Sequence, residues 1–108
     1  MCEITYVRDM KSGTFSFTAK GHADVDGGPV CAAVSAYLYL IAQGQELWQD
    51  EAILSKDIRM APGDSYVSVQ YDAGMEDAAA VQWDSVALGF IMLQENYPDR
   101  VVMACNNI

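Results

Sequence analysis

The sequence predicts an α+β fold, a two-layer sandwich in which two helices cover one face of a mostly antiparallel, four-stranded sheet (ββαββα). Two observations support this architecture: short segments with period-two alternation of apolar residues come in pairs, and a segment with helical apolar spacing follows each pair. The chain has 108 residues and is 52% hydrophobic, which fits one compact domain over residues 1–108.

The first predicted hairpin lies at the N-terminus. Residues 3–8 alternate loosely, and a turn is expected at Lys11-Ser12-Gly13. In the next segment Phe15, Phe17 and Ala19 share one face, while polar residues occupy the other, as in a half-buried strand.

The first predicted helix begins at Pro29, with Gly28 as its cap, because proline has no N–H that would be left unpaired there. It is expected to run to about Trp48, with Gly44 as a weak point near its end. The helix is apolar on nearly every side, which is typical of a helix packed between a sheet and a second partner such as another subunit.

The second predicted hairpin joins strands at residues 53–60 and 65–72 through a turn at 61–64. A second helix is expected to begin at the acidic pair Glu76-Asp77, which suits the helix dipole, and to stop at Pro98. Its apolar positions at helical spacing are Trp83, Val86, Ala87, Phe90, Leu93 and Tyr97. Residues 101–104 fit either a short edge strand or an arm, and the pattern does not distinguish the two.

The composition bears on partners and location. A net charge of −9 argues against nucleic-acid binding, which depends on clustered Lys and Arg, and favours a basic protein partner. The sequence has no signal-peptide pattern, and its longest apolar run, residues 30–42, falls short of the roughly 20 residues that cross a bilayer, so we expect a cytoplasmic protein without membrane contact. Three cysteines argue against a disulfide framework, and Cys2 and Cys105 are assigned to packing.

The candidate site lies where the first hairpin meets the first helix. His22, the single histidine, is expected at the end of a strand, and Cys31 falls in the first turn of the helix. A short loop containing glycine can therefore bring the imidazole back to the sulfur. Helix N-termini and imidazolium groups both favour thiolates, so this pairing predicts a nucleophilic cysteine with a base beside it.

Neighbouring residues supply candidate supporting groups. Asp24 or Asp26 could orient the imidazole, although both also fit solvated loop carboxylates, and Ser35 lies one helical turn after Cys31. The expected substrate loop and oxyanion-binding amides are Gly27, Gly28 and Ala32. No phosphate loop or dinucleotide fingerprint is present, and zinc usually requires more Cys and His than this site offers, so no cofactor and no metal are expected.

These motifs resemble a known family. Gly21-His22-Ala23, the segment from Val30 to Ala36 that reads VCAAVSA, and Gly89-Phe90 with Tyr97-Pro98-Asp99-Arg100-Val101 downstream are similar to the ribosomal-processing cysteine proteases called Prp. The resemblance implies a small dimeric bacterial protein of the cytoplasm. It also implies removal of an N-terminal extension from a large-subunit ribosomal protein, after an aromatic residue, with Cys31 and His22 as the catalytic dyad.

The chain departs from the family pattern between these two residues. The loop is shorter than usual and ends Gly28-Pro29-Val30-Cys31, without the aspartate that family members carry three residues before the cysteine. We therefore expect an endopeptidase that trims a ribosomal protein or a related phage or host protein. The alternatives are a non-catalytic dimeric module that binds a basic protein, and a thiol hydrolase acting on a small molecule.

Overall fold

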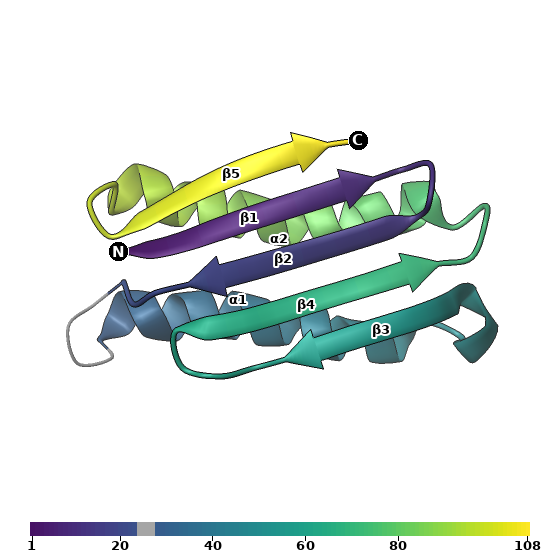
Figure 1. Cartoon of the computed structure of the whole chain (residues 1–108), viewed down its shortest axis with the longest axis horizontal. Coiled ribbons are helices and arrows are strands. Elements are labelled where there is room, and N and C mark those ends of the chain that lie inside the picture. The colour runs from purple at the N-terminus through teal and green to yellow at the C-terminus, as the bar shows by residue number, and fades with distance from the viewer. Residues whose placement is uncertain (24–27) are drawn as a thin grey trace.

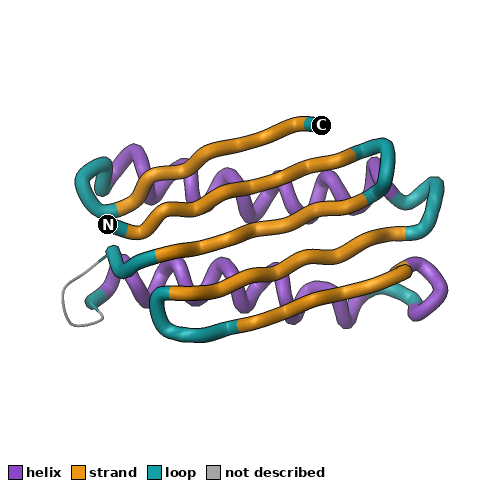
Figure 2. Tube along the Cα trace, viewed as in Figure 1, coloured by secondary structure: helices purple, strands orange, loops and turns teal. Residues whose placement is uncertain are grey.

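The computed structural model describes residues 1–23 and 28–108, and it contains two α-helices packed on one face of a five-stranded sheet (Figures 1 and 2). The α+β class and the two helices agree with the sequence prediction. The elements are β1 (Cys2–Asp9), β2 (Thr14–Lys20), α1 (Pro29–Gly44), the 3-10 turns η1 (Gln45–Leu47) and η2 (Asp50–Ala52), β3 (Ile53–Arg59), β4 (Asp64–Tyr71), α2 (Glu76–Asn96) and β5 (Val101–Asn107).

The predicted four-stranded, mostly antiparallel sheet is wrong in strand number, and the sheet is mixed. Its strand order is β3-β4-β2-β1-β5, with β5 parallel to β1 and the other three pairings antiparallel. The parallel register runs from Cys2 opposite Val101 to Arg8 opposite Asn107. Helix α2 carries the chain from β4 past β2 and β1 to the far edge of the sheet, and such a helical crossover makes β5 parallel to β4. Since β4 is antiparallel to β2 and β2 is antiparallel to β1, β5 is also parallel to β1. The segment after Pro98 is therefore a strand rather than an arm.

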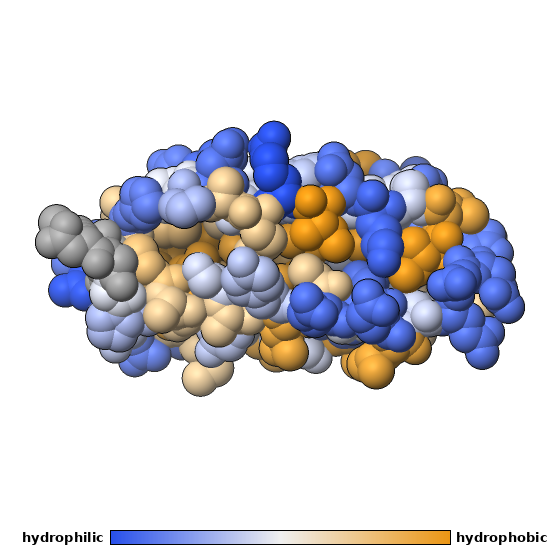
Figure 3. Space-filling view, turned by 90° about the horizontal axis from the view of Figure 1, so that it is seen from below, coloured by the Kyte–Doolittle hydropathy of each residue, from blue (hydrophilic) through white to orange (hydrophobic). Residues whose placement is uncertain are grey.

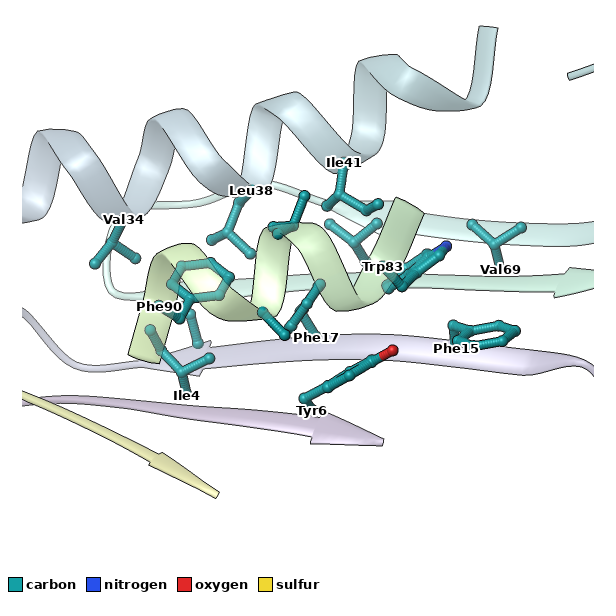
Figure 4. Close-up of a cluster of buried hydrophobic side chains, with 14 of the residues drawn as sticks. Ile4, Tyr6, Phe15, Phe17, Val34, Leu38, Ile41, Val69, Trp83 and Phe90 are labelled. Atoms are coloured by element: carbon teal, nitrogen blue, oxygen red, sulfur yellow. The ribbon is translucent and has the colours of Figure 1, made fainter. Parts of the chain in front are cut away.

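The core lies between the sheet and the helices and is dominated by aromatic rings (Figure 4). The alternation predicted for β2 is confirmed, since Phe15 and Phe17 are fully buried and point toward the helices. Trp83 of α2 lies at the centre, with its ring centroid 5.2 Å from that of Phe17 and 5.8 Å from that of Phe15. Large rings at these spacings remove much apolar area from water, which holds α2 against the sheet.

Helix α1 buries one face only. Gly28 is its N-cap and Pro29 its first residue, as predicted, and its buried side chains are Val30, Val34, Leu38 and Ile41. On the other side Leu40 is 60% and Tyr39 51% exposed, so that side is largely open to solvent in the described chain. The helix ends at Gly44 rather than near Trp48, and the chain continues into the short turn η1.

A buried polar network fixes the C-terminal end of α1. The Trp83 indole donates to the Tyr71 hydroxyl at 2.7 Å, and that hydroxyl donates to the Gln45 side-chain oxygen. The Trp48 indole donates to Gln82, whose amide donates to the Gly44 carbonyl oxygen at 3.1 Å. These bonds satisfy polar groups of both helices and of β4. They hold the Gln45 side chain in the core and the Trp48 side chain against Gln82.

Replacing Tyr71 with phenylalanine is expected to lower the free energy of unfolding by about 1–3 kcal/mol, because the Trp83 N–H and the Gln45 oxygen lose a buried partner. Urea unfolding followed by Trp fluorescence measures the change. Tyr66→Phe is the matched control, since Tyr66 lies on the other face of β4 and is only partly buried. Equal losses in the two variants would contradict a stabilising network.

Within residues 1–23 and 28–108, neither helix has both the length and the apolar content required to cross a membrane.

Candidate active site

The chain leaves β2 through a glycine that no other residue can replace without rearrangement. Gly21 has a φ of +87°, and its amide donates to the Gly63 carbonyl oxygen at 2.9 Å. A Cβ added at Gly21 would lie 2.3 Å from the Met1 carbonyl oxygen, far inside van der Waals contact. The close approach of these backbones bends the chain out of the sheet at Gly21 and fixes the position of the next residue, His22.

His22 is exposed, and its imidazole lies against the turn between β3 and β4. A Cβ added at Gly63 would come within 2.7 Å of His22 Nε2, so the ring rests directly on the Gly63 backbone. Gly63 has a φ of +69°, which favours glycine in this tight turn. Sequence analysis predicted the turn but missed the contact with His22, because strand order brings β4 beside β2 and the local sequence does not reveal that.

Cys31 is the third residue of α1 and is half-buried. The first turn of α1 carries no acidic side chain, so no carboxylate of that turn opposes the positive end of the helix dipole. The N-terminal end of a helix favours negative charge on nearby side chains, and a thiol close to one is more readily ionised. The fold therefore places the sulfur where a helix terminus supports negative charge.

A small cavity of about 40 Å³ connects the segments around Cys31. It collects residues from the start of β1, the end of β2, the turn before β4 and the first two turns of α1. Its lining is Cys2, Ala19, Gly21, Ala23, Cys31, Val34, Ser35 and Gly63. Cys31 and the two glycines that position His22 thus border one space.

A second, larger cavity of about 200 Å³ adjoins the first through a shared residue, Ser35. Its other lining residues are Tyr39, Met60, Ala61 and Pro62. It lies between α1 and the chain that leads from β3 into the Gly63 turn. The second cavity therefore lies beside the cavity of Cys31, on the Ser35 side of the helix.

The structure places five of the predicted site residues. His22 and Cys31 border the same end of the sheet, Ser35 lines the cavity of Cys31, and Gly28 caps α1. The Ala32 amide donates to the Gly28 carbonyl oxygen at 3.1 Å, which argues against Ala32 as an oxyanion donor in this conformation. The remaining predictions, Asp24, Asp26 and Gly27, lie outside the described residues.

The other two cysteines differ from each other. Cys2 is 3% exposed, in agreement with its assignment to packing. Cys105 on β5 is exposed, so its assignment to packing was wrong. The position of β5 explains the error. It is an edge strand that pairs with β1 alone, and most of its side chains face solvent.

Charged groups brace the turn that carries Gly63. Lys20 at the end of β2 pairs with Asp64, and Arg59 lies 3.6 Å from the same carboxylate. The hydrogen bond from Lys20, followed by the two positive charges, lowers the pKa of the Asp64 carboxyl. Among the described residues no three His, Cys, Asp or Glu side chains gather closely enough to hold a metal ion.

Comparison with protein families shows to which family the chain belongs. Residues 1–102 match the family model described as cysteine protease Prp. The chain belongs to the Prp family. It is accordingly a cysteine protease, and the resemblance inferred from its motifs is confirmed. No curated protein matches the chain in sequence.

Solved structures share the fold over the whole chain. A Streptococcus mutans protein is 23% identical, with a TM-score of 0.70, and the alignment covers 100% of this chain and 96% of that one. The essential ribosomal processing protease Prp from S. aureus, in complex with a covalently linked product peptide, is 17% identical, with a TM-score of 0.70 and full coverage of both chains. The same protease with a substrate peptide is 17% identical, with a TM-score of 0.70, over 98% of this chain and 100% of that one.

Proposed function

We propose that this Prp-family protease is an endopeptidase of the cytoplasm that removes an N-terminal extension from a large-subunit ribosomal protein, with Cys31 as nucleophile and His22 as base. The observation that carries the proposal is the meeting of Cys31 at the N-terminus of α1 with the two glycines that hold His22, all around one cavity. The similar S. aureus structures with bound peptides support a peptide substrate.

In this mechanism the Cys31 sulfur attacks the carbonyl carbon of the scissile bond and forms a tetrahedral oxyanion. When the oxyanion collapses, the C–N bond breaks, and the protonated His22 imidazole gives its proton to the leaving amine. A water molecule then attacks the thioester, His22 takes a proton from that water, and the acid product leaves Cys31 as a thiolate. Each step requires His22 to reach both the sulfur and the substrate nitrogen.

Supporting roles follow from the positions of the neighbours. We assign the orientation of His22 to Asp24 or Asp26, which the sequence places two and four residues further along. Ser35 lies between the two cavities and is suited to contact the substrate backbone or side chain beside Cys31. Gly27 and Gly28 allow the substrate backbone to approach without side-chain obstruction.

The larger cavity beside Ser35 is assigned to the substrate residue before the cleaved bond. Its lining includes Tyr39, Met60 and Pro62, which offer apolar and aromatic surface to a ring. Its volume of about 200 Å³ is sufficient for an aromatic side chain. We therefore propose cleavage after an aromatic residue.

Mass spectrometry of the products is the direct test of this function. The protein is incubated with a large-subunit ribosomal protein that carries an N-terminal extension, and with a version in which the aromatic residue before the cleavage point is alanine. We expect a single cut after the aromatic residue in the first and none in the second. Binding without any cut would favour the non-catalytic module, and cuts scattered over many residue types would contradict the assigned pocket.

Cleavage of a basic substrate is expected to slow as salt is added, because the charge of −9 attracts it over distances that salt screens. The effect should appear in kcat/KM between low ionic strength and about 0.5 M, where the Debye length is below about 8 Å. A neutral peptide with the same residues around the cleaved bond is the control, and its kcat/KM should change little. Equal salt sensitivity of both substrates would contradict long-range attraction.

A homodimer is expected as the working form, and the exposed side of α1 is its proposed interface. Leu40 and Tyr39 of α1, with Leu54 and Ile58 of β3, are all at least 40% exposed. Figure 3 views the molecule from the side of α1 and β3 and shows apolar groups (orange) along it, interrupted by polar ones. Exposed apolar surface of this kind is typical of an interaction site.

Sedimentation at micromolar concentration should show a dimer that Leu40→Lys converts to a monomer. Leu88→Lys is the matched control, because Leu88 is also 60% exposed but lies on α2. A monomeric unmodified protein, or a dimer that only the Leu88 variant disrupts, would contradict this interface.

A further inference from the structure

Cys2 is a buried thiol that the proposed mechanism does not use. It is the first residue of β1, its amide donates to the Arg100 carbonyl oxygen at 2.8 Å, and its side chain is 3% exposed. The chain at Gly21 lies beside it at the end of the β1–β2 pair, since a Cβ added at Gly21 would lie 3.8 Å from the Cys2 Cα. Cys2 is therefore a neighbour of the segment that carries His22.

Cys2 and Cys31 share the cavity of about 40 Å³. One cysteine comes from the sheet and the other from the first turn of α1, so two elements distant in sequence bring the two thiols to one small space. The electrostatic effect of Cys31 on Cys2 agrees with their closeness. Burial raises the pKa of the Cys2 thiol, and negative charge on Cys31 raises it further.

We propose that Cys2 is a resolving cysteine, which closes a reversible disulfide with Cys31 after a hydroperoxide has oxidised Cys31. This inference rests on the proposed role of Cys31 as the reactive nucleophile. The disulfide would protect the catalytic sulfur from irreversible oxidation and switch the protease off until a thiol reductant opens it.

The chemistry balances in two steps. The Cys31 thiolate attacks the outer oxygen of the hydroperoxide, the O–O bond breaks, and Cys31 becomes a sulfenic acid while the oxidant is reduced to water or an alcohol. The Cys2 sulfur then attacks the Cys31 sulfur, the S–O bond breaks, and the oxygen leaves as water with the Cys2 proton. The first step also removes the negative charge on Cys31 that raised the pKa of Cys2, so oxidation of one thiol makes the other a better nucleophile.

The test measures mass and activity on the full chain in a Cys105→Ser background, which removes the exposed thiol as a source of intermolecular bonds. After mild hydrogen peroxide, we expect the intact mass to fall by two hydrogens and peptide mapping to join the segments of Cys2 and Cys31. Cleavage of the peptide substrate should stop and then return fully with dithiothreitol.

The variant Cys2→Ala, in the same background, is expected to cleave peptide before oxidation. Peroxide should then add oxygen atoms at Cys31, and dithiothreitol should not restore activity once the sulfinic acid has formed. Cys2→Ser gives a second, differently packed version of the same test. Added oxygen at Cys31 with Cys2 still reduced in the parent protein would overturn the proposal, and so would recovery in the Cys2 variants equal to that of the parent.

The mass readout separates this inference from the proposed function. A disulfide in a protein that never cleaves the ribosomal extension would support the resolving role and contradict the proposed processing of a ribosomal protein. Cleavage without any disulfide would do the reverse.

Discussion

Replacing Cys31 with alanine is expected to reduce the rate of peptide cleavage by about a thousandfold or more, because the proposed acyl intermediate forms on its sulfur. The change removes one half-buried sulfur, so the fold should remain and circular dichroism should be unchanged. Single-turnover cleavage of the ribosomal extension, followed by mass spectrometry, measures the loss. Cys105→Ser is the matched control and should keep the full rate, because Cys105 is exposed on β5.

Alkylation rates give an independent measurement of the same property. Exposure alone would make Cys105 react first with iodoacetamide, Cys31 second and the buried Cys2 last. We expect Cys31 to react first, since it lies at a helix N-terminus with an imidazole nearby, and we expect His22→Ala to slow it. If the order of alkylation follows exposure and the Cys31→Ala variant still cleaves, Cys31 is not the nucleophile.

Replacing Gly63 with alanine is expected to lower kcat on the order of a hundredfold, although Gly63 takes no part in the chemistry. The new methyl group would come 2.7 Å from His22 Nε2 and force the imidazole off the turn. Displacing a catalytic group by about 1 Å is enough for a loss on the order of a hundredfold. The ring can swing outward because His22 is exposed, so the protein should still fold.

Gly74→Ala separates this effect from backbone strain. Gly74 has a φ of +93°, also in the left-handed region, but a Cβ added there meets nothing within 4 Å. Both variants should lose about 1–2 kcal/mol of unfolding free energy, the usual cost of a left-handed alanine. Only Gly63→Ala should lose activity, and a similar kcat in both variants would show that the contact with Gly63 does not position His22.

Most of the secondary structure was predictable because its signals are local. The alternation in β2 and β4, the Gly28-Pro29 start of α1 and the acidic start of α2 each lie within a few residues. Strand β5 could not be predicted with certainty, because its inward-facing residues are only Val101 and the partly buried Met103, and the residues after them are exposed. Its pairing with β1 joins residues about a hundred positions apart, and no local pattern records that.

The end of α1 shows how tertiary contacts override helix propensity. The sequence from Gly44 to Trp48 is compatible with a helix, yet the chain leaves it after Gly44. Gln45 gains the Tyr71 hydroxyl and the Trp48 indole gains Gln82, two bonds to partners distant in sequence. Burial of two polar groups with good partners outweighs one further helical turn.

The candidate site was predictable in its chemistry but not in its surroundings. The single histidine and the cysteine of the first helical turn carry a motif that sequence alone reveals. The contacts of Gly63 with His22 and of Cys2 with the Cys31 cavity depend on which strands become neighbours. A glycine in a turn and a cysteine in a strand have ordinary structural explanations until the strand order is known.

Helix α1 also separates the parts of the protein that tolerate change from those that do not. Cys31 and the anchoring residue Gln45 are 14 positions apart, about 21 Å at the usual rise of an α-helix. We expect substitutions at the Gln45 end to alter how much folded protein a cell accumulates, and those at the Cys31 end to alter what the enzyme cuts. We therefore expect the residues between His22 and Gly28 to accept another length or specificity while the anchor stays the same, and laboratory evolution of new cleavage preferences should begin there.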